Sequence, residues 1–165
     1  MIVLVGFMGA GKSTVGRALA EKLEVPFLDA DALIERRTGR TIPEIFEEDG
    51  EAGFRQIEED VILEQLGPEG VFSLGGGAVN SSAVRKALRE HFVVWLSISL
   101  DEALLRVGDD GERPMLADPE LGRIYASRHP LYQEVSDIVV DVNHASSEDI
   151  SETLAECLER VEVAA

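Results

Sequence analysis

Basic residues are scarce in this sequence of 165 residues, in which 15 lysines and arginines stand against 32 aspartates and glutamates. The formal net charge of −17 argues against a surface that releases counterions from a polyanion, so we expect no nucleic-acid partner. An anionic small molecule would have to be held by a few specifically placed arginines. The positions of the arginines are therefore informative.

The sequence has a single cysteine, and it has neither a long apolar run nor a basic segment ahead of its first apolar segment. The single cysteine, Cys157, excludes an internal disulfide and is typical of a reducing compartment. No apolar run approaches the roughly 18 residues that span a bilayer, and no basic stretch precedes the first apolar segment. We therefore expect a cytoplasmic protein with no membrane partner. We also expect a monomer, because no segment has the apolar character of an interface.

Histidine is sparse as well, and the three histidines have no partners at metal-ligating spacing: His91, His129 and His144. A length of 165 residues with 45% hydrophobic and 28% charged residues is ordinary for one globular domain. We therefore expect one domain over residues 1–165 and no metal site built from histidine or cysteine.

The most specific motif is a glycine-rich segment near the N-terminus. Residues 6–14 read Gly-Phe-Met-Gly-Ala-Gly-Lys-Ser-Thr and fit the phosphate-loop pattern G-x-x-x-x-G-K-[ST]. Glycine lets the backbone N–H groups approach phosphate closely, lysine reaches the β and γ oxygens, and serine ligates Mg²⁺. The alternative is a turn that binds nothing. We expect ATP phosphates to contact Gly9, Ala10, Gly11, Lys12, Ser13 and Thr14.

The surroundings of this loop are those that the motif requires. A β-branched apolar run at residues 2–5 precedes it, and apolar residues at helical spacing follow it. Strands and helices then alternate to the C-terminus. This alternation predicts an α/β fold, a three-layer doubly wound sheet of five parallel strands with flanking helices and ligands at the edge that holds the loop. The further strands are expected at 25–28, 71–74, 92–98 and 138–142, with helices at 32–38, 51–66, 82–90, 100–107 and 121–127, and a last one capped by Ser146 or Ser147. A short helix is also expected to begin at the capping box formed by Thr41 and Glu44 and to end near Gly50, just before the helix at 51–66.

Two carboxylates, Asp29 and Asp31, follow the second strand at this same edge. With a bend between them they can serve two neighbours, a metal and a substrate hydroxyl. The alternative is that Asp31 merely caps the helix at 32–38, because aspartate is a preferred cap.

Three further features favour ligand binding but have ordinary alternatives. Arg55 lies among many acidic residues, where a surface ion pair is the usual outcome. Three consecutive glycines at 75–77 imply a second close approach of backbone to a ligand, or else a flexible connection. The polar stretch at 108–114 carries Arg113 and is typical of a lid that closes over a transferring phosphate.

Taken together with Arg113-Pro114-Met115-Leu116 and Arg128-His129-Pro130-Leu131-Tyr132, these motifs resemble those of shikimate kinases over essentially the whole length. The resemblance implies a P-loop kinase fold of the nucleoside-monophosphate-kinase type. It also implies a substrate-binding region at about 30–60 and a lid at about 108–121. The loop at 143–147 departs from the family, which commonly has a proline there beside the base.

The resemblance also implies roles for individual residues. Ser13 would ligate Mg²⁺, with Asp29 acting through water, and Asp31 would accept a hydrogen bond from the reacting hydroxyl and is a candidate for its base. The substrate carboxylate would be clamped by Arg55 and Arg128. The remaining contacts would come from the amides of Gly76 and Gly77 to substrate, from Arg113 to the phosphates, and from Arg106 to the adenine ring unless it is an ordinary helix-surface arginine.

The activity implied is phosphorylation of the 3-hydroxyl of shikimate by ATP to shikimate 3-phosphate, a step in aromatic amino-acid (chorismate) biosynthesis. Two alternatives remain open from the sequence. One is a kinase for another small carboxylated polyol such as gluconate, and the other is a non-catalytic ATP-binding module.

Overall fold

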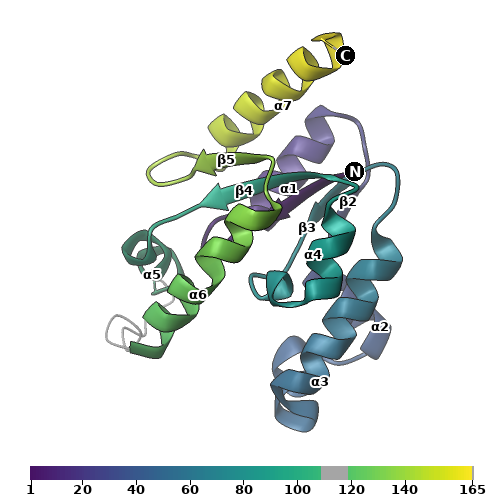
Figure 1. The fold of residues 1–165 in the computed structure, drawn as a ribbon, viewed down its shortest axis with the longest axis vertical. Helices are drawn as coiled ribbons and strands as arrows, with labels where there is room; N and C mark the ends of the chain where they lie inside the picture. The colour runs from purple at the N-terminus through teal and green to yellow at the C-terminus, as the bar shows by residue number, and fades with distance from the viewer. Residues whose placement is uncertain (109–118, 165) are drawn as a thin grey trace.

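The computed structural model describes residues 1–108 and 119–164. Its strands form one sheet in the order β2-β3-β1-β4-β5, and all neighbours are parallel (Figure 1). The predicted fold class is therefore confirmed. The strands are β1 (Ile2–Val5), β2 (Phe27–Asp29), β3 (Val71–Ser73), β4 (Phe92–Ser97) and β5 (Ile138–Asp141).

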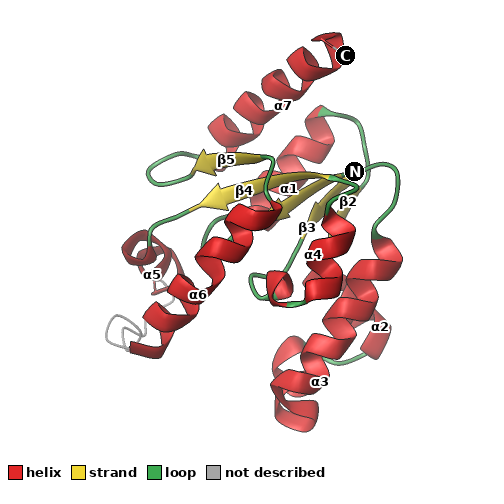
Figure 2. Ribbon diagram, in the orientation of Figure 1, coloured by secondary structure: helices red, strands yellow, loops and turns green. Residues whose placement is uncertain are grey.

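Helices cover both sides of this sheet, which gives the three layers. Figure 1 shows α1 and α7 on one side and α4 and α6 on the other, while α2 and α3 lie beyond the β2 edge. Figure 2 shows the alternation of strands and helices that the sequence predicts. None of the helices within the described residues is long and apolar enough to cross a membrane. The helices are α1 (Lys12–Lys22), α2 (Ala30–Thr38), α3 (Ile42–Gln65), the 3₁₀ turn η1 (Ala78–Asn80), α4 (Ser82–Leu88), α5 (Leu100–Gly108), α6 (Pro119–Val135) and α7 (Ser147–Ala164).

The hydrophobic core has two parts. The main cluster surrounds β1, β3 and β4, most of whose side chains are buried. A smaller cluster joins α2 to α3 and consists of Ile34, Ile45, Phe54 and Val61. The α2–α3 pair thus has its own apolar contacts beside the sheet, which stabilise the segment that carries Arg55.

Two helices differ from the prediction. The expected break near residue 50 is a kink inside α3, where Gly50 has φ 71° and ψ 179°, and α3 begins at the predicted capping box of Thr41 and Glu44. Helix α6 continues past residue 127 through Pro130. A proline removes one helical hydrogen bond, but burial of Tyr132 in the core two residues later favours continuation of the helix.

Strand β5 is correctly placed by its apolar run but lies at an edge of the sheet. Among the described residues it pairs only with β4, its burial alternates along the strand, and Val139 is 54% exposed. The apolar run therefore predicted where the strand lies, but it did not predict that side chains on one face of the strand are exposed to solvent.

Candidate functional site

The phosphate loop connects β1 to α1 in the conformation that its glycines allow. Gly9 has φ 75° and Gly11 has φ 81°, both in the left-handed region that glycine adopts without a steric penalty. Helix α1 begins at Lys12 directly after the loop, so its free N–H groups and its dipole face the concave side of the loop. This arrangement suits a multiply charged anion such as the phosphates of a nucleotide.

The side chain of Lys12 lies inside this loop, where Nζ donates to the carbonyl oxygen of Phe7 at 3.0 Å. The pKa of Lys12 is lowered from 10.5 to about 8: burial is the main cause, Asp31 and Asp29 oppose it, and Arg128 adds to it. A bound anion would favour the charged form. Asp31 and Asp29 therefore offset only part of the cost of burying the Lys12 charge, and a bound phosphate would offset more of it.

Asp29 ends β2 and lies beside the start of α1. The hydroxyl of Ser13 donates to Asp29 Oδ2 at 2.5 Å and lies 3.3 Å from the hydroxyl oxygen of Ser73. Hydroxyl and carboxylate oxygens are the hard ligands that Mg²⁺ prefers, so the residues present fit this ion. Within residues 1–108 and 119–164, no three His, Cys, Asp or Glu side chains are grouped closely enough to hold a metal by themselves.

The cap of α2 is Asp29 and not Asp31, so the capping alternative for Asp31 is wrong. Asp29 Oδ1 accepts from the N–H of Ala32 at 3.2 Å, because α2 starts at Ala30, directly after the strand. Asp31 stands in the first turn, where its Oδ1 lies 3.6 Å from the position that a Cβ at Gly75 would take. Partial burial raises the pKa of Asp31, and the neighbouring Asp29 raises it further against the effect of Lys12.

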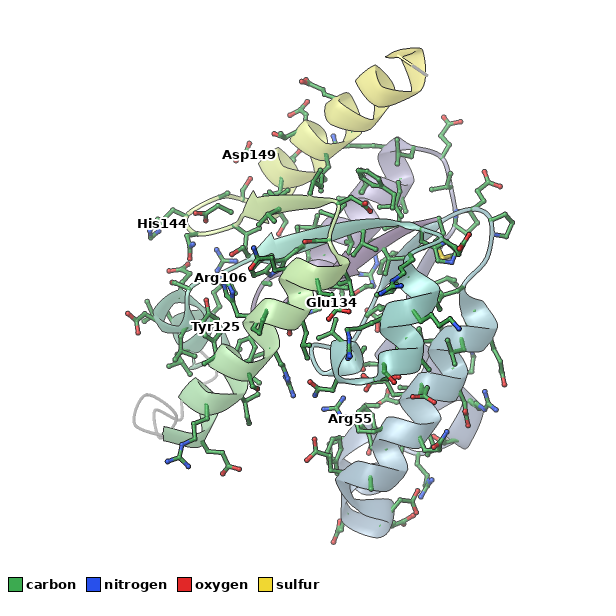
Figure 3. The ribbon with its side chains drawn as sticks, viewed as in Figure 1. Arg55, Arg106, Tyr125, Glu134, His144 and Asp149 are labelled. Atoms are coloured by element: carbon green, nitrogen blue, oxygen red, sulfur yellow. The ribbon has the colours of Figure 1, made fainter. Side chains whose placement is uncertain are left out.

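Arg55 reaches from α3 to the glycine turn after β3 (Figure 3). A Cβ atom at Gly77 would overlap the guanidinium of Arg55, so the two groups are in direct contact. Arg55 Nη1 donates to Glu58 Oε2 at 2.5 Å, and Glu58 is only 2% exposed. Arg55 also pairs with the exposed Glu51 at 3.5 Å, but its pair with the buried Glu58 holds the guanidinium against the turn. A surface ion pair alone therefore does not describe Arg55.

Arg128 approaches the same turn from α6. Its Nη1 lies 3.7 Å from the position of a Cβ at Gly76, and its guanidinium carbon lies 5.9 Å from the centre of the Phe7 ring. Arg55 and Arg128 therefore stand on the same glycine turn, next to Asp31 and to the loop of Lys12. Two guanidinium groups together suit a carboxylate.

Arg106 lies at the other end of the phosphate loop, near the end of β5 (Figure 3). Its guanidinium donates to the carbonyl oxygens of Gly9 at 3.3 Å and Val142 at 2.6 Å, and pairs with Glu102 at 3.1 Å. Arg106 is therefore not an ordinary helix-surface arginine. Arg113 and most of the expected lid lie outside the described residues.

Comparison with known proteins assigns the chain to a family. The family model described as shikimate kinase matches residues 8–159. The chain belongs to the shikimate kinase family. The curated shikimate kinases of Mycobacterium avium and Mycobacterium tuberculosis are 53% and 52% identical over 146 residues, which cover 86% of this chain and 83% of each relative.

Solved structures of this family agree with the fold. Shikimate kinase from Acinetobacter baumannii, in complex with shikimate, matches with a TM-score of 0.85 and 39% identity over 96% of this chain and 92% of that one. Shikimate kinase from Aquifex aeolicus matches with a TM-score of 0.86 and 34% identity over 99% of both chains. The expected resemblance to shikimate kinases is thus confirmed.

Sequence reasoning missed Glu58. It is one of many acidic residues in α3, and only its place three residues after Arg55, on the face that also buries Phe54 and Val61, sets it apart. Burial raises the pKa of Glu58, an effect that Arg55 opposes. Its Oε1, which has no hydrogen-bond partner among the described residues, would overlap a Cβ at Gly75. The first glycine of the turn thus leaves room for this carboxylate.

Proposed function

We propose that this chain transfers the γ-phosphoryl group of ATP to the 3-hydroxyl of shikimate, which yields shikimate 3-phosphate and ADP in aromatic amino-acid biosynthesis. The observation that carries the proposal is the convergence of four side chains around the turn at 75–77: Lys12, Asp31, Arg55 and Arg128. A phosphate site, a carboxylate and a two-arginine anion site so close together suit transfer between two anionic molecules.

On the nucleotide side, the loop amides and Lys12 bind the phosphates and offset the charge that shifts during transfer. Ser13 would ligate Mg²⁺, with Asp29 acting through water, and the bound ion would supply positive charge to the phosphates. Arg106 packs against the adenine ring, and Arg113 reaches the phosphates when the lid closes. Phosphoryl transfer leaves little covalent work to the protein, so positioning and charge neutralisation are its main contributions.

On the acceptor side, Arg55 and Arg128 bind the shikimate carboxylate, and the amides of Gly76 and Gly77 donate to the substrate. Asp31 accepts the hydrogen bond of the 3-hydroxyl and takes its proton as the oxygen attacks phosphorus. Its position between the turn and the loop of Lys12 supports this assignment. We further infer that the enzyme is a cytoplasmic monomer of one domain, with the substrate-binding region at 30–60.

A coupled assay of ADP release tests the function directly. We expect rapid ADP release with shikimate and Mg²⁺, and only background release with gluconate or nucleoside monophosphates. Turnover of gluconate without turnover of shikimate would assign another carboxylated polyol as the substrate. ATP binding without ADP release on any acceptor would indicate a non-catalytic module.

Replacing Arg128 with alanine should raise the KM for shikimate by roughly 10- to 100-fold, because charge-assisted hydrogen bonds contribute about 1.5–3 kcal/mol. A carboxylate clamp acts alike on the ground state and the transition state, so kcat should change much less. Steady-state kinetics with varied shikimate measure both parameters. An unchanged KM would remove Arg128 from the binding site.

Replacing Gly77 with alanine should displace Arg55 without unfolding the protein. Gly77 has φ −97° and ψ −5°, which alanine adopts readily, and the new methyl group would meet only the mobile end of Arg55 among its nearest atoms. We expect a rise of about tenfold in the KM for shikimate. The melting temperature should fall as well, because displacement of Arg55 weakens its ion pair with the buried Glu58. The matched control is Gly39→Ala at the end of α2, where a Cβ meets nothing within 4 Å and substitution strains only the backbone at φ 68°. It should lower the melting temperature and leave that KM unchanged.

A further inference from the structure

Tyr132 belongs to the motif that contains Arg128, yet the roles above leave it without a function. It lies one helical turn after Arg128 on α6 and is 2% exposed. Its ring packs against Trp95 with 5.8 Å between ring centres. Its hydroxyl donates to the carbonyl oxygen of Gly76 at 2.5 Å. A side chain from α6 therefore binds directly to the turn that follows β3.

This hydrogen bond acts on one particular peptide unit. The carbonyl of Gly76 and the N–H of Gly77 belong to the same planar group, so a donor at the oxygen sets the direction of the N–H at the other end. The same hydrogen bond polarises the peptide and makes its N–H a stronger donor. Three consecutive glycines have little intrinsic preference for one orientation. The Tyr132 hydroxyl therefore fixes the orientation of the Gly76–Gly77 peptide, which the glycines alone would not fix.

The phenol also lies beside Arg128. Burial raises the pKa of Tyr132 to about 12, while the nearby guanidinium of Arg128 opposes the rise. The hydroxyl consequently keeps its proton, and remains a donor, at any pH near neutrality. Arg128 itself lies against Gly76, 3.7 Å from the position of a Cβ there. Tyr132, Arg128 and the Gly76–Gly77 peptide thus form one contiguous group.

We propose that Tyr132 is a positioning residue for the acceptor site: its hydroxyl fixes the Gly76–Gly77 peptide so that the Gly77 N–H and the Arg128 guanidinium address the same substrate together. The proposal rests on the proposed function, because it takes the acceptor to lie against this turn. Tyr132 does not touch the reacting atoms, so it acts on binding of the acceptor and not on the chemical step.

The test compares Tyr132→Phe with Tyr125→Phe, a matched control on the same helix. The Tyr125 hydroxyl also donates to a backbone carbonyl, that of Ile98 at 2.8 Å, but not to the glycine turn. We expect Tyr132→Phe to raise the KM for shikimate about five- to tenfold, the effect of one lost hydrogen bond, with kcat within about twofold and the KM for ATP unchanged. Tyr125→Phe should leave the KM for shikimate unchanged, although either variant can lower the melting temperature.

A spectroscopic measurement separates positioning from stability. In protein labelled with ¹⁵N-glycine and free of substrate, the Gly77 amide proton should move upfield in Tyr132→Phe and remain in place in Tyr125→Phe. If Tyr132→Phe does not fold, 3-fluorotyrosine can be incorporated into Tyr125→Phe, where Tyr132 is the remaining tyrosine of two. The more acidic phenol should then move the Gly77 amide proton downfield.

The outcomes distinguish this inference from the function on which it rests. A wild-type protein that does not phosphorylate shikimate overturns the proposed function, and the role of Tyr132 in shikimate binding with it. If the wild-type protein is active, an unchanged KM for shikimate in Tyr132→Phe overturns the inference alone. Equal changes in both tyrosine variants also overturn it, because they indicate a general effect on stability. A stationary Gly77 resonance overturns it too, because it shows that the hydroxyl does not act on the Gly76–Gly77 peptide.

Discussion

Replacement of Lys12 by methionine will lower turnover by ~10²-fold or more and leave the protein folded. Loss of one preorganised donor to developing charge typically costs this much, and Lys12 also carries a full charge at the β and γ oxygens. Methionine has a similar length and no charge to bury. Because burial is the main cause of the lowered pKa of Lys12, its charge does not stabilise the fold. The measurements are kcat from ADP release and the melting temperature.

The same lysine predicts a pH dependence whose sign follows from its pKa of about 8. The protonated form binds phosphate, so kcat/KM for ATP, which reports groups of the free enzyme, should fall as pH rises through about 8. An unperturbed lysine would place that fall near its ordinary pKa of 10.5. Lys12→Arg is the control, because a guanidinium stays charged throughout this range. Persistence of the same fall in Lys12→Arg would assign it to another group.

Much of the fold could be predicted because local patterns and chemistry agree. The run Ile2–Val5, the glycine loop and the helix after it each imply the others, and apolar runs located the remaining strands. The order β2-β3-β1-β4-β5 could not be derived in this way. Packing between distant segments decides which strands become neighbours, and this is also why the open face of β5 was not foreseen.

The start of α2 shows how a small shift changes the role of a residue. The prediction began the helix at residue 32, which made Asp31 a candidate cap, whereas α2 begins at Ala30 and is capped by Asp29. Helix propensity and capping preference do not distinguish two aspartates separated by one alanine. The difference matters because the Asp31 carboxylate does not cap the helix and therefore remains available to a ligand.

Within the site, residues whose chemistry is distinctive could be predicted and those whose chemistry is common could not. Lys12, Arg55 and Arg128 stand out in a chain with few cations. Glu58 is one acid among many, and its significance comes from burial against Arg55. Tyr132 resembles any core aromatic until its hydroxyl is seen on Gly76. Position in the fold, and not residue type, identifies these supporting groups.

Replacement of Asp31 by asparagine will lower kcat by ~10²- to 10⁴-fold, the usual contribution of a positioned general base, and leave ATP binding intact. Asparagine matches aspartate in size and can still accept a hydrogen bond from the substrate, but it cannot take a proton. Helix α2 keeps its cap at Asp29, so a loss of activity is not a loss of the helix. Nucleotide affinity from calorimetry and kcat from ADP release measure the two effects separately.

The pH dependence of kcat/KM for shikimate tests the role of Asp31 separately. Because the pKa of Asp31 is raised by partial burial and by Asp29, kcat/KM for shikimate should fall on acidification at a pH above the usual range of aspartate. That acidic limb should vanish in Asp31→Asn. Glu35→Gln removes a neighbouring carboxylate on the same helix and should keep both the activity and the limb. Full activity of Asp31→Asn would show that the carboxylate has no part in proton transfer, because a neutral amide of the same shape would then suffice.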